Sequence, residues 1–123
     1  MDEQTNEINI PEGNNLSLVG FKKLDKTEID KVKEILLPYI KKLEEKTDYD
    51  LLKIELRIHP RSHTFIHELE SDLLLRPGKI LSAKSVDKNL YKAIPLLMKK
   101  LISEVEHIKK KTIRERPIRK KII

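Results

Sequence analysis

The chain has 123 residues, of which 26 are Lys or Arg and 20 are Asp or Glu, so its formal charge is +6. This length predicts a single domain, and the charged fraction of 37% is well above the usual quarter. The absence of cysteine excludes a disulfide framework, a cysteine-ligated zinc finger and a thiol nucleophile. No apolar run approaches the length of a membrane span and the N-terminus lacks a signal peptide. We therefore expect a soluble, cytoplasmic protein with no membrane partner.

Charge is distributed unevenly along the chain. Residues 1–15 contain four acidic residues and no basic one, which predicts a disordered acidic leader. The C-terminal residues 112–123 form a basic tail, which we expect Pro117 to break. Between them, residues 16–111 form the predicted domain. A basic tail of this kind binds an anionic polymer or keeps the protein in solution.

The first predicted elements are a strand over residues 16–21 and a helix that ends near Lys46. Two capping boxes compete for the start of this helix, one at Asp25 with Glu28 and one at Thr27 with Asp30. Its apolar residues recur every three or four positions and predict one buried stripe: Ile29, Val32, Leu36, Tyr39 or Ile40, and Leu43. Pro38 interrupts this pattern and is expected to kink or split the helix.

Three further strands and a second helix follow. Residues 52–59 alternate between apolar and polar side chains and predict a strand with one buried face. Residues 60–64 are a predicted loop, residues 65–75 a second strand, residues 76–79 a turn, and residues 80–86 a shorter strand. We expect Asp87 to cap the last helix, which runs to about Lys111 with Pro95 near its start. The apolar stripe of this helix is predicted to consist of Leu90, Ala93, Ile94, Leu97, Leu101, Val105 and Ile108. The predicted fold class is α+β, a β-α-β-β-β-α sandwich with two helices packed on one face of a four-stranded sheet.

Sequence motifs for catalysis are absent. The chain has neither a nucleophile elbow nor a glycine-rich phosphate loop. Glu68, Glu70 and Asp72 share one face of a strand and are interpreted as a solvated face with the cross-strand partners Lys53 and Arg57. We expect no enzymatic activity, no cofactor, no metal site and no small-molecule substrate.

Three histidines recur at every fourth residue, a spacing that would align metal ligands on a helix: His59, His63 and His67. The flanking segments alternate as strands, so the helical spacing does not apply. His59 and His67 could still meet across a hairpin that carries His63 at its tip. We favour an exposed hairpin whose polar rings are able to touch RNA.

The basic residues of the helices are better candidates for function. Lys92, Lys99, Ser103 and Lys110 are predicted to lie on one stripe opposite the core, with Lys100 beside it. Lysines of the first helix, including Lys41 and Lys42, also lie off its apolar stripe. Together these side chains would form a basic surface suited to the phosphate backbone rather than to base edges. The aromatic residues Tyr39, Tyr91 and Phe65 are expected in the core, so sequence-specific binding of single strands is not expected.

The segment from Ala83 to Leu101 resembles the ribosome hibernation-promoting factor family, also called the ribosome-associated inhibitor A family. The resemblance extends over about residues 16–111 and includes the order of elements. The residues that fit the family pattern at the last helix are Leu90, Tyr91, Ala93, Ile94, Lys100 and Leu101. The chain departs from that pattern at Asn89 and Pro95, where the family has Asp, and at Ser103, where a basic residue is common.

The resemblance implies a non-enzymatic protein that binds the small ribosomal subunit and its rRNA in the mRNA and tRNA channel. Such a protein would inhibit translation by holding idle ribosomes inactive. Lys100 and Lys42 are the contacts carried over from the family, and the stripe geometry adds Lys41, Lys92 and Lys99. The remaining predicted RNA contacts are electrostatic anchors near the C-terminus: Lys109, Lys110, Lys111, Arg114 and Arg116.

Two other classes of function stay open from the sequence. A general double-stranded RNA-binding module or RNA chaperone would bind free duplex as tightly as ribosomes. A protein-interaction module would use the basic tail to dock an acidic partner, and its binding would survive nuclease treatment.

Overall fold

The computed structural model describes residues 8–9, 16–76 and 78–122, with side chains for 16–76 and 78–109. The elements in chain order are β1 (Ile8–Asn9), β2 (Leu16–Val19), the 3-10 turn η2 (Phe21–Lys23), α1 (Lys26–Lys46), β3 (Tyr49–Arg61), β4 (Thr64–Leu75), β5 (Ile80–Asp87) and α2 (Leu90–Ile122). The chain has the α+β architecture predicted from the sequence.

The strands form one mixed sheet in the order β1-β2-β3-β4-β5. β2 pairs parallel to β3, as a crossover through α1 requires, and the other pairs are antiparallel. The predicted four-stranded sheet is confirmed, and the two-residue β1 adds a short fifth strand at its edge. β1 falls within the predicted leader, the rest of which lies outside the described residues.

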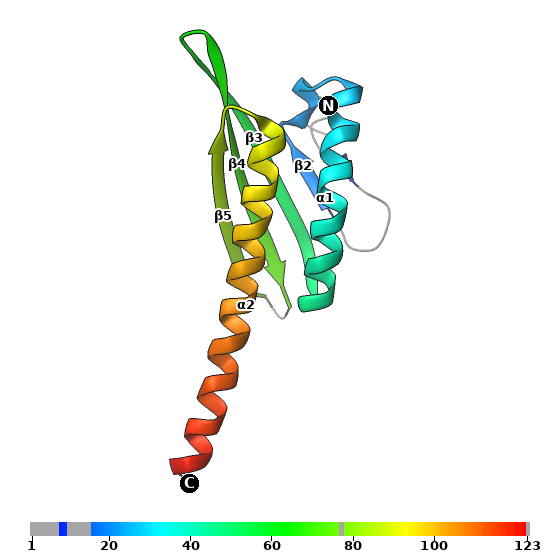
Figure 1. Ribbon diagram of the computed structural model, residues 1–123. Coiled ribbons are helices and arrows are strands. Elements are labelled where there is room, and N and C mark those ends of the chain that lie inside the picture. Colours follow the sequence, from blue (N-terminus) through cyan, green and yellow to red (C-terminus); the bar gives the residue numbers. More distant parts are fainter. Residues whose placement is uncertain (1–7, 10–15, 77, 123) are drawn as a thin grey trace.

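Both helices cover the same face of the sheet and run in the same direction (Figure 1). The side chains of Leu52, Ile54 and Leu56 alternate onto this face and are almost completely buried. The helices bury their predicted apolar stripes against them, namely Val32, Leu36, Ile40 and Leu43 from α1 and Leu90, Ala93, Ile94, Leu97, Leu101 and Val105 from α2. Within the described part of the chain, neither helix covers the opposite face of the sheet (Figure 1), which is called the uncovered face below.

The starts of the helices differ in how well the sequence predicted them. At α1, Asp25 is the N-cap, and its carboxylate accepts a hydrogen bond of 2.8 Å from the Glu28 amide in a complete capping box. At α2, the prediction that Asp87 is the N-cap is wrong. The cap is Asn89, whose Oδ1 accepts a hydrogen bond of 2.9 Å from the Tyr91 amide. Asp87 instead accepts a bond from the Asn89 amide, and so orders the turn into the helix.

Two predicted interruptions of the helices do not occur. α1 is not split at Pro38, because buried side chains on both sides of it hold one continuous stripe against the sheet. α2 continues past Lys111 and Pro117 to Ile122, since its Lys, Arg and Glu residues favour the helical state. In the part of the chain that the structure describes, no helix is long and apolar enough to cross a membrane.

The hairpin between β3 and β4 is longer than predicted. The expected loop over residues 60–64 shrinks to the two residues Ser62 and His63, and Pro60 and Arg61 belong to β3. Ser62 adopts a positive φ of 45°, the backbone region that two-residue hairpin turns use. The hairpin therefore projects as a two-stranded extension at the end of the molecule opposite the end of α2 (Figure 1).

Candidate nucleic-acid interface

The first part of α2, residues 90–103, carries positive charge and no acidic residue. We define the basic face of α2 as Lys88, Lys92, Lys99 and Lys100, which are all exposed. No Asp or Glu occurs between Asp87 and Glu104. Lys92 and Lys99 are seven residues apart, so they lie two turns apart on the side of the helix that points away from the core. Ser103 continues this stripe and is also exposed.

Lys100 lies on the side of α2 that faces the edge strand. Its ammonium group donates a hydrogen bond of 2.7 Å to the carbonyl oxygen of Lys84 on β5. This bond uses one of three N–H donors and leaves two for a ligand. Between α2 and β5 lies a shallow hollow, which is lined by Ser82, Ala83, Lys99, Lys100, Ser103 and Glu104. The hollow lies along the edge of the sheet, where a phosphate backbone could approach both elements.

α1 contributes less clearly to a basic surface. Lys41 and Lys42 are both exposed. Lys42 lies one turn before Lys46, whose ammonium contacts Glu106 of α2 at 2.7 Å, so Lys42 lies on the side that faces α2. The exposed carboxylates of Glu34 and Glu45 share the outer surface of α1. The predicted basic surface across both helices is therefore strongest on α2 and mixed in charge on α1.

The N-terminal ends of α1 and α2 lie close to one another. Tyr91 of α2 packs against the core, and burial raises the pKa of its phenol, with a smaller contribution from the nearby carboxylates of Glu28 and Asp25. These acidic residues belong to the start of α1. Acidic side chains therefore border the basic face of α2 at this end.

The predicted anchors near the C-terminus are only partly described. Lys109 is exposed and borders a second shallow hollow with Arg76 and residues 44–48 at the end of α1. The backbone of α2 carries Lys110, Lys111, Arg114 and Arg116, but their side chains lie outside the described residues. Their contribution to binding stays a prediction.

Sequence reasoning missed one lysine that the fold adds to this surface. Lys88 is exposed and immediately precedes the cap of α2. The absence of acidic residues from 88–103 was the signal that could have identified it. Lys84 of β5 offers only its backbone carbonyl to Lys100, because its side chain points to the opposite face of the sheet, where its ammonium lies 3.9 Å from Glu70.

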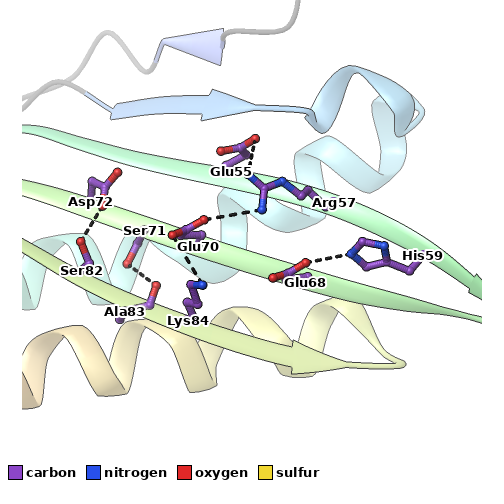
Figure 2. A network of polar contacts seen from close by, with 10 residues as sticks. All are labelled: Glu55, Arg57, His59, Glu68, Glu70, Ser71, Asp72, Ser82, Ala83 and Lys84. Carbon is purple, nitrogen blue, oxygen red and sulfur yellow. Dashed lines mark hydrogen bonds and ion pairs between the residues drawn. The ribbon is translucent and has the colours of Figure 1, made fainter.

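The uncovered face of the sheet carries a network of paired charges (Figure 2). Glu68, Glu70 and Asp72 share this face, as predicted. Arg57 contacts Glu70 at 3.7 Å and Glu55 at 3.3 Å, which confirms its predicted role as a cross-strand partner. Asp72 accepts a hydrogen bond of 2.6 Å from Ser82, although Lys53 stands opposite it in the register. This face is neutralised by its own pairs rather than left open as an anionic site.

The three histidines do not converge. His59 lies on the uncovered face, where its Nε2 is 2.8 Å from Glu68 Oε1. This hydrogen bond lowers the pKa of the Glu68 carboxyl below its ordinary value. His67 pairs with Ile58 on the opposite face, and His63 occupies the turn. Among the described residues, no group of three His, Asp or Glu side chains is arranged to hold a metal ion.

The solved structures that are similar to this chain include the following two. A ribosomal subunit interface protein from Coxiella burnetii matches with a TM-score of 0.51 and 16% identity, over 70% of this chain and 86% of that one. The N-terminal domain of Protein Y from Thermus thermophilus matches with a TM-score of 0.47 and 21% identity, over 69% of this chain and 86% of that one. No protein-family model and no curated protein matches the chain. At these identities the likeness is one of fold.

Proposed function

We propose that this protein binds the small ribosomal subunit in the mRNA and tRNA channel and inhibits translation, as a ribosome hibernation factor does. The observation that carries the proposal is the acid-free basic face of α2, presented on a fold shared with a ribosomal subunit interface protein. The sequence resemblance in residues 83–101 includes that same segment. In this role the protein needs no catalytic group, since occupancy of the channel excludes its normal ligands by volume.

The chemistry of the face suits recognition of a phosphate backbone. Lysine ammonium groups bind phosphate as point charges and carry no information on base sequence. Tyr39 and Tyr91 are packed against the core, so neither offers a stacking surface beside the lysines. Binding would therefore depend on shape and charge, as expected for an rRNA surface of fixed three-dimensional form.

A general double-stranded RNA-binding module is the alternative that the same face supports, because phosphates of any RNA helix would satisfy the lysines. The two functions differ in selectivity. A hibernation factor prefers the small subunit over the large subunit and over free duplex, whereas a general module binds all three according to their accessible phosphates.

Equilibrium binding at 0.15 M salt tests this selectivity. The labelled protein is titrated with purified small subunits, large subunits and a free RNA duplex under the same buffer conditions. The proposal predicts affinity for small subunits at least tenfold above that for the other two. Equal affinities would support the general module, and binding that survives ribonuclease treatment would instead indicate a protein partner.

A further inference from the structure

The end of the β3–β4 hairpin extends beyond the rest of the sheet. β2 pairs with β3 only as far as Glu55, and β5 pairs with β4 only as far as His67. We define the hairpin arm as residues 59–66, which pair only with each other. A two-stranded ribbon is marginally stable by itself in water, so we expect the side chains of this arm to have a role in binding as well as in packing.

An aromatic side chain is exposed on the arm. Phe65 was expected in the core, but 57% of its surface is accessible, because the arm reaches past the helices that would cover it. It lies opposite Pro60 across the ladder, and both side chains are exposed. An exposed phenyl ring in water loses the free energy that burial would give it, and it offers a flat face to a planar ligand.

The arm that carries this ring contains no acidic residue, and Asp87 of β5 stands opposite His67 beyond its base. Residues 57–67 contain two arginines and three histidines and no acidic residue. At the base of the arm, Arg57 and His59 are paired with carboxylates. Within the described part of the chain, the side chains of Arg61 and His63 at the tip have no ion-pair partner. The tip thus combines an exposed aromatic ring on one face of the ribbon with an unpaired guanidinium on the other face and an imidazole in the turn that joins the two strands.

We propose that the hairpin arm binds an unpaired nucleotide of RNA, with Phe65 stacked on the base and Arg61 and His63 at the neighbouring phosphates. Base–aromatic stacking beside a cationic side chain is the mode by which proteins bind unpaired nucleotides without reading their sequence. The inference rests on the proposed function for its biological setting, where the nucleotide belongs to rRNA. It differs from the basic face of α2, which contacts phosphates only.

Two plainer roles compete with this one. Phe65 could serve only to stabilise the hairpin through its cross-strand contact with Pro60, since aromatic pairs of this kind contribute to strand pairing. The arm could also dock on a protein. Neither role places a base against the ring, so a probe at this position separates them from stacking.

The chain contains no tryptophan and three tyrosines, so Phe65→Trp introduces a single tryptophan at this position, which is excited at a wavelength where tyrosine does not absorb. The matched control is Ile80→Trp, because Ile80 is similarly exposed, at 60%, but lies at the far end of the sheet. Each variant is titrated with a 12-nucleotide single-stranded RNA of mixed sequence, with the same sequence as a duplex, and with small ribosomal subunits. Stacking predicts quenching of the Phe65→Trp emission by the single strand and by the subunit but not by the duplex, and unchanged emission of the control.

A second variant, Phe65→Leu, keeps an apolar side chain and removes the aromatic face. Loss of one stacked base predicts binding of the single strand that is about 5- to 150-fold weaker, with an unchanged thermal melting curve. Unquenched Phe65→Trp and full affinity of Phe65→Leu would overturn the inference. If subunits bind without quenching, the inference fails and the proposed function stands. If only the free single strand binds and quenches, the arm binds RNA and the proposed function fails.

Discussion

Reversing the charge of Lys99 and Lys100 removes two adjacent cations from the basic face of α2. Both side chains are exposed and line the hollow beside β5, and neither contributes to the hydrophobic core. The double variant Lys99→Glu/Lys100→Glu is therefore expected to fold. Its one internal loss is the bond from Lys100 to the Lys84 carbonyl, and an exposed bond of this kind contributes about 1 kcal/mol.

The expected loss of binding follows from counterion release. Each lysine–phosphate contact releases about 0.7–0.9 of a counterion, which is worth about 1 kcal/mol at 0.15 M salt. Two lost contacts therefore weaken binding by about 2 kcal/mol, or roughly 30-fold, and repulsion from the new carboxylates adds to this. The slope of log K against log salt should become shallower by about 1.4 to 1.8.

The assay is a titration of small subunits at four salt concentrations between about 0.05 and 0.2 M, a range over which phosphate contacts alter affinity strongly. The control is Lys26→Glu/Lys53→Glu, which makes the same change in net charge at exposed positions on α1 and on the uncovered face of the sheet. The control should keep most of the affinity and the wild-type slope. Equal losses in the two variants would refute the assignment to α2 and leave only a dependence on net charge.

Three further predictions concern the fold that presents this face. Gly20→Ala should lower the free energy of unfolding in urea by about 2–5 kcal/mol, because φ at Gly20 is +84° and an added Cβ would clash with the Leu56 carbonyl oxygen. A loss below about 1 kcal/mol would contradict this. Asn89→Ala should cost about 1 kcal/mol, while Asn89→Asp keeps the cap, and equal melting temperatures for both variants would refute the capping role. In ¹³C NMR the pKa of the Glu68 carboxyl should lie below its ordinary value, and it should rise in the His59→Ala variant. Because the pKa is lowered in the folded state, the carboxylate stabilises the protein at pH values above its ordinary pKa, and this stabilisation is lost as the pH falls through the lowered pKa.

The sequence predicted the features of the fold that depend on periodicity. The alternation in β3 and the stripes of α1 and α2 each place apolar side chains on one face, and the structure buries those stripes. The box at Asp25 was recognised as one of two candidates because its two partners are three residues apart. These signals come from residues that are close together along the chain, so they can be recognised in a single sequence.

The errors arose where tertiary context decides the outcome. Phe65 is apolar and follows a strand pattern, but its exposure depends on how far the hairpin extends past its neighbouring strands. The stripe of lysines on α2 was predicted from helical periodicity, whereas the hydrogen bond from Lys100 to the Lys84 carbonyl required the packing of β5 against that helix. Similarly, Asp is a residue type that often caps helices, but Asp87 is the last residue of β5. Asn89, two residues later, accepts the capping hydrogen bond from the Tyr91 amide.

Sedimentation through a sucrose gradient at near-physiological salt tests the central claim most directly. The purified protein is mixed with small subunits that are either empty or loaded beforehand with mRNA and initiator tRNA. Binding in the channel predicts co-migration with empty subunits and loss of co-migration with loaded ones. Protein that remains at the top of the gradient with empty subunits, or that co-migrates equally with both, would contradict the proposed site.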